Sequence, residues 1–208
     1  LEQIIEAEGS IPTPVNAIDA INLAIGQGAT LVTPVQVARF IAAIGNGGEL
    51  MRPQVIEKIL SANDEAVYTF QPESMGSLPL SPETLQALQE GMNWVVTKPR
   101  GTAYFRFRNL DVPVSGKTGT AESPPGDPHA WFAGYSRQND PHKPDIAVVV
   151  IVENGGEGSQ MAAPVFRRAI SLYFSDMEDP GGIMPWEVEP YIAATPTPTN
   201  TATPPSEE

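Results

Sequence analysis

The feature that most limits the fold of this chain is a series of β-prone runs separated by short links. The runs cover Val112 to Thr120, Ala130 to Ser136 and Ile146 to Glu153. Parallel strands need a crossover of roughly a dozen or more residues, usually a helix, and the links are too short for that, so the strands should pair antiparallel. Because the last run is almost entirely β-branched, we expect it to be covered on both faces.

Helix signals stand before and after these runs. Thr33-Pro34-Val35-Gln36 supplies an N-cap, a proline for the first turn and a capping-box glutamine, and the glycines from Gly45 to Gly48 end the helix. A second helix should begin at Ser81 and end before Gly101, and a last one should cover roughly Ala162 to Phe174. Since helices and strands are grouped and do not alternate, the pattern predicts an α+β fold, an antiparallel sheet flanked by helices.

Other segments carry local signals. Leu1 to Ala29, punctuated by glycine and proline, should be an irregular lead-in. Val55 to Leu60 and Ala66 to Phe70 indicate a hairpin. Thr102 to Arg108 is β-prone and should form a strand. On that strand Arg106 and Arg108 would share one face, which we expect to be solvated, although it could favour an anionic substrate.

Composition sets the domain organisation. We expect one folded unit over residues 1–178 and a tail over residues 179–208, because the Thr/Pro-rich sequence after Tyr191 cannot bury a core and should be disordered. The chain opens at Leu1 without a methionine or a basic leader, so we expect it to be a segment of a longer protein. Its longest apolar run, Ile146 to Val152, is strand-sized and too short to cross a bilayer.

Charge and residue usage exclude several functions. A net charge of −13 argues against nucleic acid as a partner, since phosphate binding needs clustered Lys and Arg. Having no Cys, the chain contains neither disulfides nor a thiolate nucleophile. His129 and His142 lack the spacing of metal ligands, so no metal is expected.

The sharpest motif is Ser115-Gly116-Lys117-Thr118-Gly119-Thr120. A phosphate-binding loop would need a glycine where Asp111 stands and a helix afterwards, and both are missing. On a strand at the edge of a sheet, the Lys117 ammonium and the hydroxyls of Thr118 and Thr120 would suit a carboxylate. Gly119 would let a ligand backbone approach, and the Thr120 N–H could donate to an oxyanion.

Further motifs surround this one in a fixed order, and together they carry a resemblance. The set resembles class B penicillin-binding proteins, elongation-type peptidoglycan D,D-transpeptidases, over about residues 20 to 175. The resemblance implies the C-terminal part of a penicillin-binding/serine β-lactamase-like fold, incomplete here. It also implies that Lys117, Thr118, Gly119 and Thr120 contact the substrate, and that Lys117 and the Thr120 backbone N–H take part in catalysis. The motifs are Gly26-Gln27-Gly28, Thr33-Pro34-Val35-Gln36-Val37-Ala38, Asn46-Gly47-Gly48, Gly101-Thr102-Ala103, Lys117-Thr118-Gly119-Thr120-Ala121-Glu122, His129-Ala130-Trp131-Phe132-Ala133-Gly134-Tyr135, Val152-Glu153-Asn154-Gly155-Gly156 and Ala162-Ala163-Pro164.

The chain departs from that family in one respect. The family's nucleophile lies in Ser-x-x-Lys, and no Ser of this chain is followed by Lys at the third position. Ser61-Ala62-Asn63 matches the family's Ser-x-Asn motif in letters, but it follows the Gly-Gln-Gly segment, whereas the family places that motif before it. We interpret it as a hairpin turn, where Ser and Asn are common. We therefore predict that this chain alone is inactive.

The resemblance implies a whole protein that cross-links peptidoglycan stem peptides ending in D-alanyl-D-alanine through an acyl-enzyme, and that β-lactams acylate. It implies an extracytoplasmic location, an N-terminal transmembrane anchor absent from this chain, no cofactor, and as partners the missing N-terminal part and a cell-wall elongation complex. Two alternatives stay open, a noncatalytic muropeptide- or β-lactam-binding sensor and a structural wall-associated domain. A serine β-lactamase fits the motif context less well.

Overall fold

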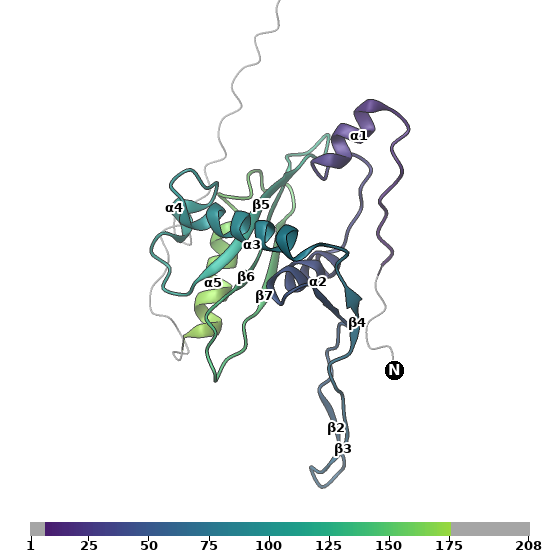
Figure 1. Cartoon of the computed structure of the whole chain (residues 1–208), viewed down its shortest axis with the longest axis vertical. Coiled ribbons are helices and arrows are strands. Elements are labelled where there is room, and N and C mark those ends of the chain that lie inside the picture. The colour runs from purple at the N-terminus through teal and green to yellow at the C-terminus, as the bar shows by residue number, and fades with distance from the viewer. Residues whose placement is uncertain (1–6, 176–208) are drawn as a thin grey trace, which may run out of the picture.

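The centre of the molecule is an antiparallel sheet. In the computed structural model, which describes residues 7–175, the sheet consists of β5 (Val114–Ala121), β6 (His129–Ser136) and β7 (Ala147–Val152), in the order β5-β6-β7. Val114 lies opposite Ser136 at one end of the β5–β6 pair, and Ala121 lies opposite His129 at the other. The predicted antiparallel pairing is confirmed (Figure 1).

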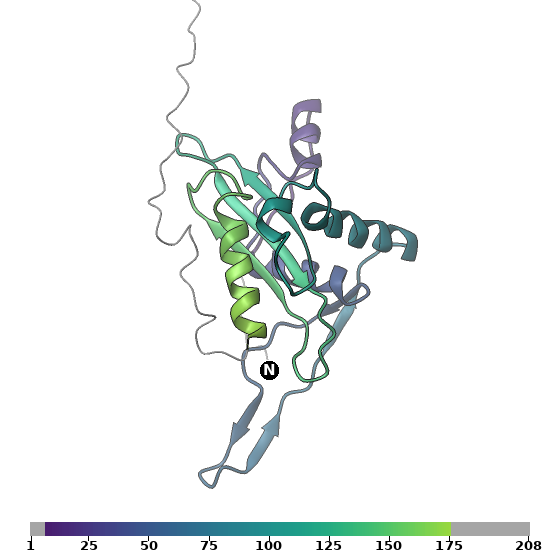
Figure 2. The same cartoon turned by 90° about the vertical axis from the view of Figure 1, so that its left-hand side faces the viewer.

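Helices cover both faces of this sheet. Helix α2 (Pro34–Gly45) packs on β6 and β7 from one side and α5 (Ala162–Phe174) from the other, which confirms that β7 is covered on both faces (Figure 2). Helix α3 (Pro82–Thr97) contacts β5. The helices begin where their caps predict: the Thr33 hydroxyl accepts a hydrogen bond from the Gln36 N–H at 3.1 Å, and the Gln36 side chain accepts one from the Thr33 N–H at 2.9 Å.

Alternation along β6 divides the core into two clusters. Phe132 points toward α5, where its ring centroid lies 4.7 Å from that of Phe166 and 5.2 Å from that of Phe107. The neighbouring Ala133 and Tyr135 belong to the other cluster, with residues of α2 and α3. Burial of a single phenylalanine stabilises a fold by about 1.5–3 kcal/mol. The fully buried Phe132 and Phe166 therefore contribute strongly to the stability of the cluster under α5.

A long hairpin extends from the body of the molecule (Figures 1 and 2). At its base β1 (Glu49–Met51) pairs with β4 (Ser74–Ser77), and further out β2 (Lys58–Leu60) pairs with β3 (Ala66–Thr69). The outer pair confirms the predicted hairpin, while β1 and β4 were not predicted. Ser61-Ala62-Asn63 lies at the tip, where the Ser61 hydroxyl accepts hydrogen bonds from the N–H groups of Asn63 and Glu65, as the turn interpretation requires.

Two local predictions were wrong. Residues 1–29 are not irregular throughout, because α1 (Ala17–Ala24) forms with Asn16 as its N-cap. The segment Thr102–Arg108 is not a strand: it contains the short helix α4 (Tyr104–Phe107), which places Phe107 in the aromatic core against Phe132. A strand would have turned every second residue outward, whereas one turn of helix buries Phe107.

The same correction moves two arginines. In α4 the Arg106 guanidinium is partly buried and donates to the Ser159 carbonyl at 3.1 Å, and the Arg108 guanidinium lies 5.6 Å from the Phe105 ring centroid. Neither belongs to a solvated strand face. Residues 176–208 lie outside the described part, so the boundary at 178 and the disordered tail stay predictions. Within residues 7–175, no helix is both long enough and apolar enough to cross a bilayer.

Candidate functional site

The Lys-Thr-Gly segment lies on β5, an outer strand of the sheet, as the sequence predicted. Lys117 stands opposite Ala133 and Thr118 opposite Phe132, so their side chains leave the sheet on opposite faces. Met92 and Val96 of α3 belong to the clusters on the two different faces. Helix α3 therefore passes from one face to the other around β5. Because the Lys117 and Thr118 side chains lie on opposite faces, one ligand could reach both only along the outer edge of β5.

The hydrogen-bond phase of β5 shows which backbone groups reach that edge. The Arg137 N–H donates to the Pro113 carbonyl at 2.8 Å, so this pair is the hydrogen-bonded kind. Alternation along an antiparallel ladder then makes the pairs at Lys117 and Gly119 hydrogen-bonded and those at Thr118 and Thr120 not. The Thr120 N–H and carbonyl consequently point away from β6, toward the outer edge.

The side chains of the motif add a cation and a hydroxyl at the same edge. The exposed Lys117 ammonium donates to the Thr118 carbonyl at 2.7 Å. An ammonium has three N–H donors, so this contact leaves capacity for an incoming anion. The Thr118 hydroxyl lies 2.8 Å from the Thr102 hydroxyl, which comes from the turn before α4. The edge thus presents a positive charge beside polar hydrogens, an arrangement that fits a carboxylate.

Close backbone packing explains the glycine of the motif. A Cβ on Gly119 would lie 3.1 Å from the Trp131 Cβ. The loop before α5 comes equally near, because a Cβ on Gly158 would lie 2.3 Å from the Gly119 carbonyl oxygen and 2.2 Å from that of Trp131. The backbone at Gly119 is therefore packed between β6 and the loop before α5, and this packing holds the adjoining Thr120 in place.

A hollow of about 530 Å³ lies at the end of this edge. Its polar rim includes Thr120, Glu122 and His129, and the His129 Nδ1 accepts a hydrogen bond from the Asn154 N–H at 2.9 Å. Its apolar wall combines the sheet with the segment that joins α1 to α2. The apolar side chains lining it are Ile25, Leu31, Val32, Val37 of α2, Ala121, Trp131 and Ile151.

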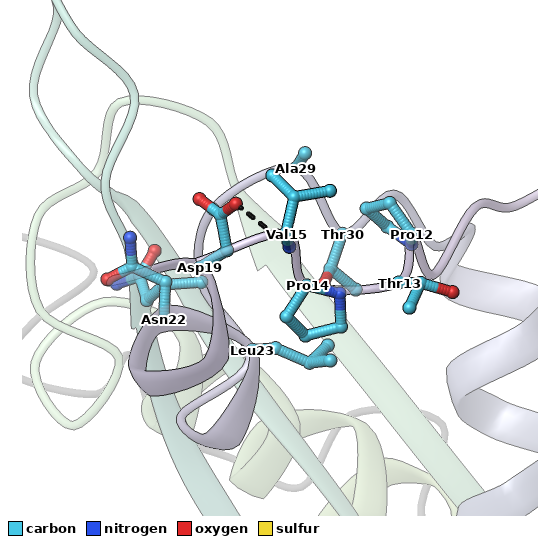
Figure 3. A pocket seen from close by; sticks show the side chains of 11 residues that line it. Pro12, Thr13, Pro14, Val15, Asp19, Asn22, Leu23, Ala29 and Thr30 are labelled. Atoms are coloured by element: carbon cyan, nitrogen blue, oxygen red, sulfur yellow. Dashed lines mark hydrogen bonds between the residues drawn. The ribbon is translucent and has the colours of Figure 1, made fainter. Parts of the chain in front are cut away.

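A second hollow, of about 230 Å³, lies within the N-terminal segment (Figure 3). The Asp19 carboxylate accepts a hydrogen bond from the Val15 N–H at 3.3 Å, and Pro12 and Pro14 stand nearby (Figure 3). Gln27 and Gly28 line both hollows, so their loop separates the two. In the part of the chain that is described, no group of three or more acidic or imidazole side chains could hold a metal ion.

The structure thus brings Lys117, Thr118, Gly119 and Thr120 to one edge and adds two residues that sequence reasoning gave no role. One is Thr102, the hydroxyl partner of Thr118. The other is Gln27, whose side-chain amide donates to the Thr120 carbonyl at 3.0 Å. Both belong to motifs noted in the sequence, but their contacts join segments far apart in the chain and no local pattern could predict them.

Known proteins resemble this chain over most of its length. Residues 2–171 match the family model described as the penicillin binding protein transpeptidase domain. The chain is 33% identical over 158 residues to the peptidoglycan D,D-transpeptidase PbpA of Mycolicibacterium smegmatis, covering 71% of this chain and 30% of that protein. It is 29% identical over 174 residues to the peptidoglycan D,D-transpeptidase MrdA of Haemophilus influenzae, covering 76% of this chain and 26% of that protein.

A solved structure shares the fold. It is described as showing coordination of polymerization and crosslinking by a peptidoglycan synthase complex, and it is similar to this chain with a TM-score of 0.70 at 34% identity. The similarity covers 85% of this chain and 31% of the solved one. The chain therefore spans less than a third of these longer proteins.

Proposed function

Because this chain belongs to the penicillin-binding protein transpeptidase domain family, we propose that it supplies the substrate-binding edge of a peptidoglycan D,D-transpeptidase site. In this proposal Lys117 and Thr118 bind the free carboxylate of a stem peptide ending in D-alanyl-D-alanine. The Thr120 N–H donates to the oxygen that becomes negative when the scissile carbonyl is attacked. No metal or organic cofactor takes part.

The observation that carries the proposal is the outer position of the motif on β5. A hydrogen bond from a fixed backbone N–H to a developing oxyanion stabilises the transition state, because the donor needs no reorganisation. The Thr120 N–H has this fixed character, since its strand is paired with β6 on the inner side and Gly119 is packed against Trp131 and Gly158. The ammonium of Lys117 adds the charge that a substrate carboxylate requires.

The nucleophile would come from the rest of the same protein. In the proposed reaction a serine attacks the penultimate D-alanine carbonyl and the terminal D-alanine leaves, taking up a proton. An amine from a neighbouring stem peptide then attacks the acyl ester, which releases the serine. A β-lactam would acylate the same serine. Since no Ser in this chain begins a Ser-x-x-Lys motif, we propose that the chain alone does not acylate.

Exposed apolar side chains near α1 support the proposal that another part of the same protein docks on this chain. Helix α1 buries none of its residues, and Ile18, Ile21 and Ile25 are 70%, 64% and 70% exposed. The apolar wall of the larger hollow adjoins them through Ile25. A surface of this type is stabilised when another apolar element covers it. We propose that the missing N-terminal part of the protein does so and thereby brings the serine to β5.

The proposal extends to the location and partners of the whole protein. Peptidoglycan cross-linking takes place outside the cytoplasmic membrane, so the protein would be extracytoplasmic and anchored by an N-terminal transmembrane helix. It would act in a cell-wall elongation complex, in keeping with the similar solved chain from a peptidoglycan synthase complex.

Titration with N-acetyl-D-alanyl-D-alanine tests the substrate-binding edge. We expect the Thr120 amide signal in an NMR spectrum to shift with added peptide. Lys117→Ala should weaken binding by about tenfold or more, since hydrogen bonds to charged groups contribute about 1.5–3 kcal/mol. Lys58→Ala, which removes an exposed lysine from the hairpin, is the matched control and should leave binding unchanged. Equal effects of the two substitutions would refute the proposal.

One alternative is a noncatalytic module that binds muropeptides or β-lactams as a sensor, which a whole protein without a Ser-x-x-Lys motif would favour. Both functions predict binding at Lys117. They differ in the whole protein, which a fluorescent penicillin should label covalently only if it is a transpeptidase. A structural wall-associated domain would show no dependence of ligand binding on Lys117.

A further inference from the structure

We infer that Gln27 is a positioning residue that pairs with the outer edge of β5 as one residue of a parallel neighbouring strand would, an inference that rests on the proposed function for its link to the ligand. The Gln27 side-chain nitrogen donates to the Thr120 carbonyl at 3.0 Å, and its oxygen accepts from the Glu122 N–H at 3.2 Å. One carboxamide thus satisfies a carbonyl and an N–H two residues apart on the same side of a strand.

The two contacts match the spacing of a β ladder. The backbone groups of Thr120 lie on the outer side of β5, by the alternation that the Pro113–Arg137 pair fixes, and the Glu122 N–H continues this alternation one residue beyond the end of the strand. Within residues 7–175 no strand pairs with that side. Gln27 takes the place of such a strand at this one position.

The loop that carries Gln27 is built to hold it there. Its neighbours Gly26 and Gly28 have φ angles of +73° and +80°, values that side chains other than those of Asn and Asp rarely tolerate. The Gln27 N–H donates to the Asn22 carbonyl at 2.8 Å, which ties the loop to the last turn of α1. The carboxamide therefore reaches β5 from a backbone that is itself tied to α1.

Gln27 affects the proposed site by restraining the backbone that carries the Thr120 N–H. Gln27 fixes the peptide group after Thr120, and the packing of Gly119 fixes the backbone before it. The Thr120 N–H lies between these two constraints and is the group proposed to meet the oxyanion. Gln27 acts through Thr120 and does not need to touch the ligand itself.

Two ligand-free measurements on the 208-residue chain test this role. The first is hydrogen exchange of the Glu122 amide, and the second is the carbonyl ¹³C shift of Thr120. We expect Gln27→Ala to speed Glu122 exchange roughly fivefold, the factor that corresponds to loss of one hydrogen bond of ordinary net strength, and to shift the Thr120 carbonyl signal. Gln27→Glu keeps an acceptor but loses the donor, so it should shift only the Thr120 signal.

A second glutamine provides the control. Gln54 also donates from its side-chain amide to a backbone carbonyl, that of Gln71 at 3.1 Å, but it lies in the projecting hairpin. Gln54→Ala should change neither Thr120 nor Glu122. Unchanged Glu122 exchange in Gln27→Ala would overturn the inference. Faster exchange of Phe132 in step with Glu122 would also overturn it, because the effect would then be a general loss of stability.

Titration with N-acetyl-D-alanyl-D-alanine links the residue to the ligand. Gln27→Ala should weaken the response of the Thr120 amide several-fold relative to the unsubstituted chain. If the unsubstituted chain does not respond at all, the proposed substrate site fails, while the exchange and carbonyl measurements still decide whether Gln27 holds the edge of β5. If both chains respond equally, the positioning role is wrong and the substrate site stands.

Discussion

The hydroxyl of Thr102 lies 2.8 Å from the hydroxyl of Thr118. Thr102 belongs to the turn between α3 and α4, and Thr118 is the middle residue of the Lys-Thr-Gly motif, so this contact joins two motifs that the chain separates. Its effect is to orient the Thr118 hydroxyl at the outer edge of β5. The edge is therefore organised from two directions, by Thr102 on one side and by Gln27 on the other.

A double-mutant cycle should detect this contact. We expect Thr102→Val and Thr118→Val each to lower the free energy of unfolding slightly, with a coupling of about 0.5–1 kcal/mol, because the contact is exposed and its net strength is at the low end. Urea unfolding of the four chains measures it. Strictly additive effects would mean that the hydroxyls do not bond, and Thr97→Val, at the end of α3, serves as the uncoupled control.

The chain should not react covalently with penicillins. After incubation with a fluorescent penicillin and denaturing electrophoresis, we expect no labelled band, because a binding edge without a nucleophile cannot form an ester. The serine nearest to Lys117 in sequence, Ser115, is fully buried and cannot reach a ligand. A stoichiometric band would refute the prediction, and loss of that band in Ser→Ala variants would identify the reacting residue.

The chain should self-associate through β7. In the described residues β7 ends the sheet opposite β5, and its side chains are only half-buried. An apolar edge with unpaired backbone groups is a template for pairing with another chain. We expect a molecular mass that rises with concentration in sedimentation equilibrium.

A single substitution can probe that edge. The Ser136 N–H donates to the Ile146 carbonyl, so alternation places the Val149 N–H on the outer side of β7. Val149→Pro removes this donor without breaking the ladder to β6 and should shift the chain toward the monomer. A chain that is monomeric at every concentration, or an association that Val149→Pro leaves unchanged, would contradict the prediction.

Two glycines should respond to alanine in opposite directions. A Cβ on Gly134, in the central strand, would lie 2.4 Å from the Ser115 carbonyl and 3.1 Å from the Phe166 ring, so Gly134→Ala should destabilise the fold by about 1–3 kcal/mol or more. A Cβ on Gly91, inside α3, would meet nothing within 4 Å, and Gly91→Ala should stabilise by about 0.5–1 kcal/mol. Thermal or urea unfolding measures both, and equal shifts would contradict the packing described for β6.

The turn between β6 and β7 depends on one carboxylate. Asp145 accepts hydrogen bonds from the Ser136 hydroxyl at 2.7 Å and from the N–H groups of Gln138 and Asn139 at 2.7 and 3.2 Å. Asp145→Ala should lower the free energy of unfolding by about 2–4 kcal/mol, because these donors lose their charged partner. The control is Asp111→Ala at an exposed position, expected within about 0.5 kcal/mol of the unsubstituted chain. Comparable losses would show that the turn does not need Asp145.

Local sequence signals predicted correctly those helices and strands whose ends are marked by capping or turn residues. The capping box at Thr33 determined the start of α2, Ser81 that of α3, and the short links between the β-prone runs determined their antiparallel order. They failed for α1, a short helix between glycine and proline residues, although Ile18, Ile21 and Ile25 show helical spacing. They failed again for α4, whose aromatic residues are typical of strands but whose Phe107 is drawn into the core by Phe132 and Phe166.

By itself, then, the sequence determined the α+β class, the antiparallel pairing of the strands and the motif at Lys117, because caps, turns and alternation act over a few residues. The tertiary structure alone decided that Gln27 and Thr102 meet β5, since those contacts depend on how the loop after α1 and the turn after α3 are placed beside the sheet. It also decided that the Thr120 N–H points outward, because the phase of a strand's hydrogen bonds is fixed by its register with the neighbouring strand.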